Sequence, residues 1–236
     1  MSVDYNNSSA QQSDGAQKNV YRLSDGLTRQ NIVLMSGIAI APVAMCATNY
    51  DSAIILSVGF TMIAFLSVLL CRFVPKHISY MVRVVLYALI AGVVYIPTYL
   101  YLVYAYGAEA VAALGVYLPL LTVNPLILSK TETRFRLRPL PMMTLELAGY
   151  LTGFNVVCIA VGTARDILAN GRIGIYEVEF GLSIPAVSTG FGGLLLIGIA
   201  AGVFRWWYNR MRAREERELE KERKRLELLA FLEGRK

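Results

Sequence analysis

Prolines and asparagines interrupt two long apolar stretches of this sequence, where they could build a polar site inside a membrane. They are Pro42 and Asn49 in the stretch 31–49, and Pro119, Asn124 and Pro125 in the stretch 114–129. A proline inside a helix removes one backbone donor and clashes with the carbonyl four residues earlier. Because hydrocarbon offers no water to the freed carbonyl, such a break is tolerated only where it faces protein or a polar cavity. We therefore expect two broken half-helices that point toward the middle of the bilayer.

The interruptions allow two interpretations. Paired proline-interrupted segments in the two halves of a chain are typical of an inverted repeat with a binding site at the bilayer midplane. On this interpretation Pro42, Asn49, Pro119 and Asn124 are candidates for the wall of a pore or substrate site. Alternatively, the prolines only kink structural helices, and the asparagine side chains satisfy backbone groups that the breaks leave free.

Glu146 is a carboxylate near the start of a further apolar stretch, residues 142–164. An acidic side chain inside a membrane suggests a path for cations or protons. Its position close to the end of the stretch also allows an ion pair with Arg136 or Arg138, which would give it a structural role. Both roles remain open at the level of the sequence.

Other chemistry is poorly supported. The three cysteines, Cys46, Cys71 and Cys158, lie in or beside apolar segments and form no CxxC pair, which is typical of small packing residues. His77 is the only histidine, so it cannot build a histidine metal site. No nucleophile with a neighbouring base and no phosphate-binding glycine loop is found. We therefore expect no self-contained active site.

Composition places the chain in a membrane. Hydrophobic residues make up 56% of the 236 residues, charged residues only 17%, and the mean hydropathy is +0.49. A soluble domain has about a quarter charged residues. The formal net charge of +6 does not indicate a nucleic-acid surface, because the basic residues flank apolar stretches.

Six apolar stretches are predicted to span the bilayer, which makes the chain an all-α integral membrane protein with a 3+3 inverted repeat. The predicted spans are residues 31–49, 53–71, 84–106, 114–129, 142–164 and 186–204. The first and fourth contain the broken half-helices. A plain span needs about 20 apolar residues, which these stretches approach.

The basic residues predict the orientation and the division of the chain. Loops on one side carry almost all lysines and arginines, so the positive-inside rule places both termini in the cytoplasm of a plasma-membrane protein. Residues 1–28 are polar and predict a flexible tail. Residues 29–208 would form the membrane domain, and 209–236 a charged cytoplasmic helix. That helix is expected to continue the last span in solvent, and docking to a partner or to lipid headgroups is the alternative.

Several short motifs resemble one family of membrane proteins. They are Ala41-Pro42 with Thr48-Asn49, Tyr104–Gly107 followed by Leu114–Asn124, Arg165–Gly171, and Ile184-Pro185-Ala186 before a glycine-rich stretch. In this order and at this spacing they resemble the paired six-helix membrane subunits of the Rnf and Na⁺-pumping Nqr redox complexes. The resemblance is to the E-type Rnf and D-type Nqr members of this family, and it covers about residues 28–208.

The resemblance implies a partner and a cofactor. In this family two homologous subunits lie in opposite orientations, and each gives one cysteine from each broken helix to a 2Fe-2S cluster. At the corresponding positions this sequence has Ala41 and Pro125, neither of which can bind iron. The first motif also has one extra residue between Pro42 and Asn49. We therefore expect no cofactor, and no cluster held in the manner of the family.

The resemblance predicts a membrane subunit of an Rnf-like complex that couples electron flow from ferredoxin or NADH to Na⁺ or H⁺ movement. Its partners would be an inverted homologous subunit, further Rnf-like subunits and membrane lipids, and not nucleic acid. One alternative is a small secondary transporter or channel that uses the broken helices as its site. Another is a cluster-free structural subunit that braces a membrane complex.

Overall fold

Four helices are long and apolar enough to cross a membrane. The structure is a computed structural model that describes residues 31–75, 77–174, 176–177 and 184–233. Over these residues the long helices are α4 (Tyr50–Cys71), α5 (Tyr80–Tyr106), α9 (Leu140–Asn170) and α10 (Gly190–Glu233). They coincide with four of the six predicted spans. The chain is therefore a mostly helical protein with membrane-spanning character, and the predicted tail 1–28 lies outside the described residues.

The other two predicted spans consist of short pieces. Residues 31–49 hold several turns and α3 (Ile40–Cys46). Between α5 and α9 the chain forms α6 (Ala108–Ala112), α7 (Tyr117–Leu120), η2 (Leu121–Val123), η3 (Leu126–Lys130), α8 (Thr131–Thr133) and η4 (Phe135–Leu137). Neither segment contains a continuous membrane-length helix. Six spans and an inverted 3+3 repeat therefore stay predictions.

The prolines lie at the beginnings of these short helices. Pro42 is the third residue of α3, and Pro119 is the third residue of α7. Pro125 directly precedes η3. The first backbone N–H groups of a helix have no partner within it, so a proline there loses no hydrogen bond. Each proline thus starts a new helical piece where a continuous helix would have been interrupted.

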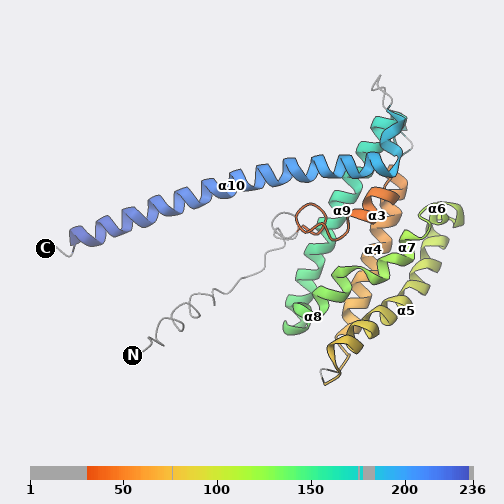
Figure 1. The fold of residues 1–236 in the computed structure, drawn as a ribbon, viewed down its shortest axis with the longest axis horizontal. Helices are drawn as coiled ribbons and strands as arrows, with labels where there is room; N and C mark the ends of the chain where they lie inside the picture. Colours follow the sequence, from red (N-terminus) through yellow and green to blue (C-terminus); the bar gives the residue numbers. More distant parts are fainter. Residues whose placement is uncertain (1–30, 76, 175, 178–183, 234–236) are drawn as a thin grey trace, which may run out of the picture.

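The last part of the chain closes one end of the fold. α9 ends at Asn170 and is capped by Gly171, whose φ of +64° is the left-handed conformation that favours glycine. A two-residue antiparallel pair follows, β1 (Arg172–Ile173) and β2 (Tyr176–Glu177). The short helix η5 (Pro185–Ser188) then leads into α10. In Figure 1, α10 leaves the bundle and extends far beyond it.

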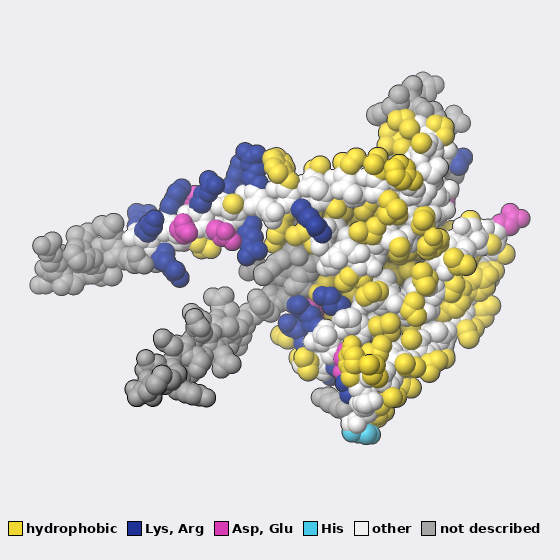
Figure 2. Space-filling model, viewed as in Figure 1, with side chains coloured by type: hydrophobic (Ala, Val, Ile, Leu, Met, Phe, Trp, Pro, Cys, Tyr) yellow, Lys and Arg dark blue, Asp and Glu magenta, His cyan; other side chains and the backbone are white. Residues whose placement is uncertain are grey.

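The centre of the bundle is the contact between α4 and α9. More than half of each helix's most apolar stretch is buried, whereas only 22% of that of α5 and 11% of that of α10 is buried. Phe60 and Phe154 meet across this contact with their ring centroids 4.2 Å apart. Figure 2 shows hydrophobic side chains covering the outside of the bundle, while lysines and arginines gather on the outer half of α10 and near α8. This surface suits a lipid environment or further membrane subunits.

Candidate functional site

The two interrupted segments meet at one pocket. This pocket has a volume of about 190 Å³ and is lined on one side by Ile38, Ala41 and Pro42, and on the other by Tyr117, Leu120, Leu121, Val123, Asn124 and Pro125. Residues at least 75 positions apart in the sequence are thus brought together. Ala41 and Pro125 are both exposed, so the pocket lies at the surface of the chain. A second protein could therefore complete it.

The asparagine side chains near the breaks serve the fold. Asn49 Oδ1 accepts a hydrogen bond of 2.8 Å from the backbone N–H of Ser52 and so caps the start of α4. Asn124 is only 6% exposed, and its Oδ1 accepts one of 2.9 Å from the N–H of Leu126. These bonds satisfy backbone donors at helix starts. Of the four candidate residues, Pro42 and Asn124 line the pocket, whereas Asn49 and Pro119 do not.

The pocket does not fit an iron–sulfur cluster held by this chain. Iron in such clusters is ligated by cysteine thiolates, but the two positions where the resemblance implies thiolates are Ala41 and Pro125. Cys46, the nearest cysteine in sequence, is buried, and its Sγ–H points at the carbonyl of Leu114, 3.5 Å away. Among the described residues no group of three or more His, Cys, Asp or Glu side chains could hold a metal ion.

Arg165 ties the first interrupted segment to the last helix. Its side chain is fully buried, and all its hydrogen bonds go to backbone carbonyls. Nη1 donates to Ala44 and Ala47 at 2.8 Å each. Nε and Nη2 donate, each at 2.9 Å, to Val187, Ser188 and Thr189. Five donors thus meet five carbonyls, which uses the full capacity of a guanidinium.

This arrangement places a positive charge at the end of α3. Ala44 and Ala47 lie in its last turn and just beyond it, where helix carbonyls lack partners. A cation there also interacts favourably with the negative end of the helix dipole. The backbone of α10 approaches closely enough that a Cβ on Gly193 would lie 2.9 Å from Arg165 Nη1. Arg165 therefore holds the end of α3 in place, while residues at the start of α3 line the pocket.

Asp166 provides a second tie at the same end of the bundle. It is 1% exposed, and its Oδ2 accepts hydrogen bonds of 3.3 Å from the N–H groups of Tyr50 and Gly174. Its Oδ1 accepts one of 2.8 Å from Asn170 and lies 3.5 Å from Arg172 Nε. Asp166 therefore holds the start of α4 and the β1–β2 turn against α9.

Glu146 pairs with two arginines at the opposite end of α9. It is fully buried, and its carboxylate contacts Arg134 on one oxygen and Arg138, at 3.1 Å, on the other. The pairing with Arg138 is one of the two that the sequence suggested, whereas Arg136 bonds elsewhere. An ion-transport role of Glu146 stays a prediction. Its carboxylate is enclosed by cations and does not face the 190 Å³ pocket.

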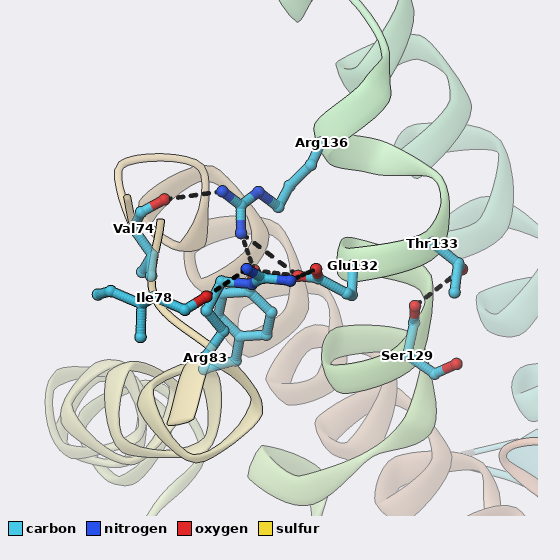
Figure 3. A network of polar contacts seen from close by, with 8 residues as sticks. Val74, Ile78, Arg83, Ser129, Glu132, Thr133 and Arg136 are labelled. Carbon is cyan, nitrogen blue, oxygen red and sulfur yellow. Dashed lines mark hydrogen bonds and ion pairs between the residues drawn. The ribbon is translucent and has the colours of Figure 1, made fainter. Parts of the chain in front are cut away.

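Arg136 belongs to a network around Glu132, which Figure 3 shows. The Glu132 carboxylate accepts hydrogen bonds from Arg83, from Tyr87 at 2.6 Å and from Arg136 at 3.3 Å. Arg136 also donates to the carbonyl of Val74 at 3.0 Å. The network joins α5 to the short helices α8 and η4. Burial alone would raise the pKa of Glu132, but the hydrogen bonds and charges of these three neighbours outweigh it and hold that pKa below its usual value.

Glu132→Gln is expected to destabilise the protein at neutral pH by about 2 kcal/mol, because a charged acceptor of three hydrogen bonds is lost. A depressed pKa contributes stability above the unfolded value of about 4.3, and this contribution disappears as the pH falls through the folded value. The difference in melting temperature between wild type and variant in detergent should therefore shrink below about pH 4.

Glu216→Gln is the matched control for Glu132→Gln, because Glu216 also pairs with an arginine, Arg212, but 61% of its side chain is exposed. We expect it to change stability by less than about 1 kcal/mol at any pH. A Glu132→Gln deficit of equal size at pH 7 and pH 3.5 would contradict the assigned role of the carboxylate charge.

Sequence reasoning missed the residues that organise this fold most strongly. From the sequence, Arg165 and Asp166 stand out only as part of a motif, and Glu132 is not singled out. A signal existed for Arg165 and Asp166, since they continue an apolar helix in which unpaired charges are costly. Their partners are mostly backbone groups far away in sequence, and those partners cannot be read from residue types.

Comparison with known proteins gives a consistent match. The sequence model of one family, described as "Rnf-Nqr subunit, membrane protein", matches residues 20–206. The E-type subunit of an ion-translocating oxidoreductase complex from Yersinia pestis is 25% identical over 162 residues, which cover 64% of each chain. The D-type subunit of a Na(+)-translocating NADH-quinone reductase from a Shewanella species is 22% identical over 153 residues, which cover 64% of this chain and 71% of the relative. The chain thus spans slightly less than two thirds of the Yersinia relative.

Proposed function

We propose that this chain, which belongs to the Rnf-Nqr family of membrane subunits, is a subunit of an ion-translocating electron-transfer complex. The complex would be of the Rnf type, with ferredoxin or NADH as electron donor and Na⁺ or H⁺ as the ion that moves. The relatives named for ion translocation support this proposal. The observation that carries it is the match over residues 20–206, which includes both interrupted segments and the Arg165–Asp166 ties.

The chain would act in the membrane beside a homologous subunit of opposite orientation. The shared pocket supports this, because both interrupted segments reach the surface there and expose Ala41 and Pro125. The basic residues at the α4–α5 and α8–α9 connections support a plasma-membrane orientation in which this end and both termini face the cytoplasm.

Within the complex this subunit would work without the cluster thiolates of its family. Neither residue at the two positions has a group that binds iron, and the thiol of Cys46 is directed at a carbonyl. Its contribution would be to hold the interrupted segments in place against the partner. Electron carriers would then have to reside on other subunits.

The proposal is tested by purifying the tagged chain from its native membrane in mild detergent. We expect flavoprotein and ferredoxin-like subunits and a homologous membrane subunit to co-purify, as identified by mass spectrometry. Membrane vesicles should take up Na⁺ or H⁺ when electrons are supplied, and vesicles from a deletion strain should not. A chain that purifies alone, together with normal ion uptake by the deletion strain, would contradict the proposal and favour an independent transporter.

Two variants test the pocket and the missing ligands. Ala41→Trp should fill the pocket and reduce co-purification of the homologous subunit, whereas Leu89→Trp, on the exposed face of α5, should not. Cys46→Ser should leave the iron and labile sulfide content of the purified complex unchanged. A loss of iron in Cys46→Ser would show that a displaced thiolate serves as a ligand.

A further inference from the structure

A second, strongly cationic pocket lies near the start of α9. It has a volume of about 550 Å³ and is lined by Lys130, Thr133, Arg134, Leu137 and Arg138. It is separate from the pocket at the interrupted segments, with which it shares no lining residue. The proposed function assigns it no role, and its chemistry indicates an anionic ligand.

The charges at this pocket do not balance. Lys130, Arg134 and Arg138 are cationic, and Glu146 is the carboxylate that pairs with the two arginines. These four side chains leave a formal surplus of two positive charges. Lys130 lies over the ring of Tyr150, with Nζ 5.5 Å from the centroid, and no ion pair of Lys130 is found among the described residues. An incoming anion would offset this surplus.

The backbone adds to the attraction. α9 begins at Leu140, two residues after Arg138, and has no acidic residue in its first turn. Its 31 residues direct the positive end of a long helix dipole toward the same region. Burial, and then the charge of Arg134, lower the pKa of Lys130, and an anion beside the ammonium would counteract both effects.

Exposed apolar side chains lie in the wall of the cationic pocket and in the segment that follows it. Leu137, which lines it, is 77% exposed, and Leu140, Met142 and Leu145 on the first turns of α9 are each about half exposed. Figure 2 shows this neighbourhood of basic and hydrophobic side chains beside α8. A free phosphate ion would use only the cationic part, whereas a lipid would use both parts.

We propose that this pocket binds the phosphate of an anionic phospholipid, with Lys130, Arg134 and Arg138 around the head group and the acyl chains over the apolar start of α9. Basic pockets at the membrane end of helices are known to hold such head groups. Glu146 pairs with the two arginines and so limits the surplus positive charge that is available to the lipid phosphate. The site would fasten the α8–α9 connection to the lipid leaflet at this end of the bundle.

The test measures lipid retention by native mass spectrometry on the purified full chain, offered phosphatidylglycerol or phosphatidylcholine at equal concentration. Wild type should retain phosphatidylglycerol preferentially. Lys130→Gln should reduce this retention about fivefold, the effect of one basic residue near a membrane surface. Lys221→Gln, which removes the same charge from an exposed position on α10, should leave it unchanged. Melting temperatures confirm that both variants are folded.

A variant that is expected to increase lipid retention provides a second test. Glu146→Gln removes the competing carboxylate, so the folded fraction of this variant should retain more phosphatidylglycerol than wild type. Equal retention of the two lipids by wild type, or equal losses in Lys130→Gln and Lys221→Gln, would overturn the proposal. Displacement of the lipid by inorganic phosphate at the same concentration would show a phosphate-ion site and would overturn the lipid assignment.

Discussion

Arg165→Met should destabilise the protein by more than about 4 kcal/mol, because two buried and three partly buried carbonyls lose the guanidinium that donates to them, and each buried group left unsatisfied costs about 1–3 kcal/mol. Most of the variant is expected to aggregate on extraction, and the folded remainder should melt well below wild type in a detergent thermal scan. Because Arg165 holds the end of α3, Cys46 should also become reactive to maleimide, as located by peptide mass spectrometry.

Two further arginine variants show whether the stability depends on the charge of Arg165 or on the geometry of its guanidinium. Arg165→Lys keeps the charge but has three donors on one atom, so it should recover only part of the lost stability. Arg172→Met removes a 53% exposed side chain that lies 3.5 Å from Asp166, and it should cost less than about 1 kcal/mol. Unchanged melting and unchanged Cys46 labelling in Arg165→Met would show that the carbonyl cluster does not hold α3.

Gly162→Val should be the second most damaging substitution, with a cost of at least about 3 kcal/mol, the upper end of the range for overpacking. A Cβ at Gly162 would lie 2.4 Å from Ala53 Cβ and 2.9 Å from the carbonyl oxygen of Asn49. α4 and α9 would have to separate at the contact that forms the centre of the bundle. The fraction of monodisperse protein in size-exclusion chromatography and the melting temperature measure the effect.

Gly92→Val and Gly198→Val are the controls, since nothing lies within 4 Å of a Cβ at either position. Both lie in apolar helices, so the chemical change is the same, and we expect shifts within about 0.5 kcal/mol. Equal damage from all three variants would mean that valine itself, and not the α4–α9 distance, causes the loss.

The long helices could be predicted from the sequence because hydropathy alone determines them. The predicted spans 53–71, 84–106 and 142–164 fall within α4, α5 and α9, and the predicted span 186–204 lies largely on α10. The interruptions at Pro42 and Pro119 were also visible, since proline has no backbone donor. Whether the short pieces complete two further spans depends on the bilayer and on neighbouring subunits, so hydropathy cannot decide it.

The candidate site was predictable only in part. The sequence predicts two interrupted segments, and the structure brings Ala41 of one and Pro125 of the other to the same pocket. The ties made by Arg165 and Glu132 could not be predicted. A guanidinium bound by five carbonyls leaves no pattern of complementary charges in the sequence. The sequence also does not show that Arg136 pairs with Glu132 and not with Glu146.

The uninterrupted course of α10 has a consequence for the reach of the subunit. Its 44 residues extend for about 66 Å at 1.5 Å per residue, while the hydrocarbon layer is only about 30 Å thick. A straight helix of this length that crosses the hydrocarbon layer along its own axis leaves roughly half its length outside that layer. The charged half of such a helix extends away from the hydrocarbon layer and presents its lysines, arginines and glutamates to molecules outside the lipid.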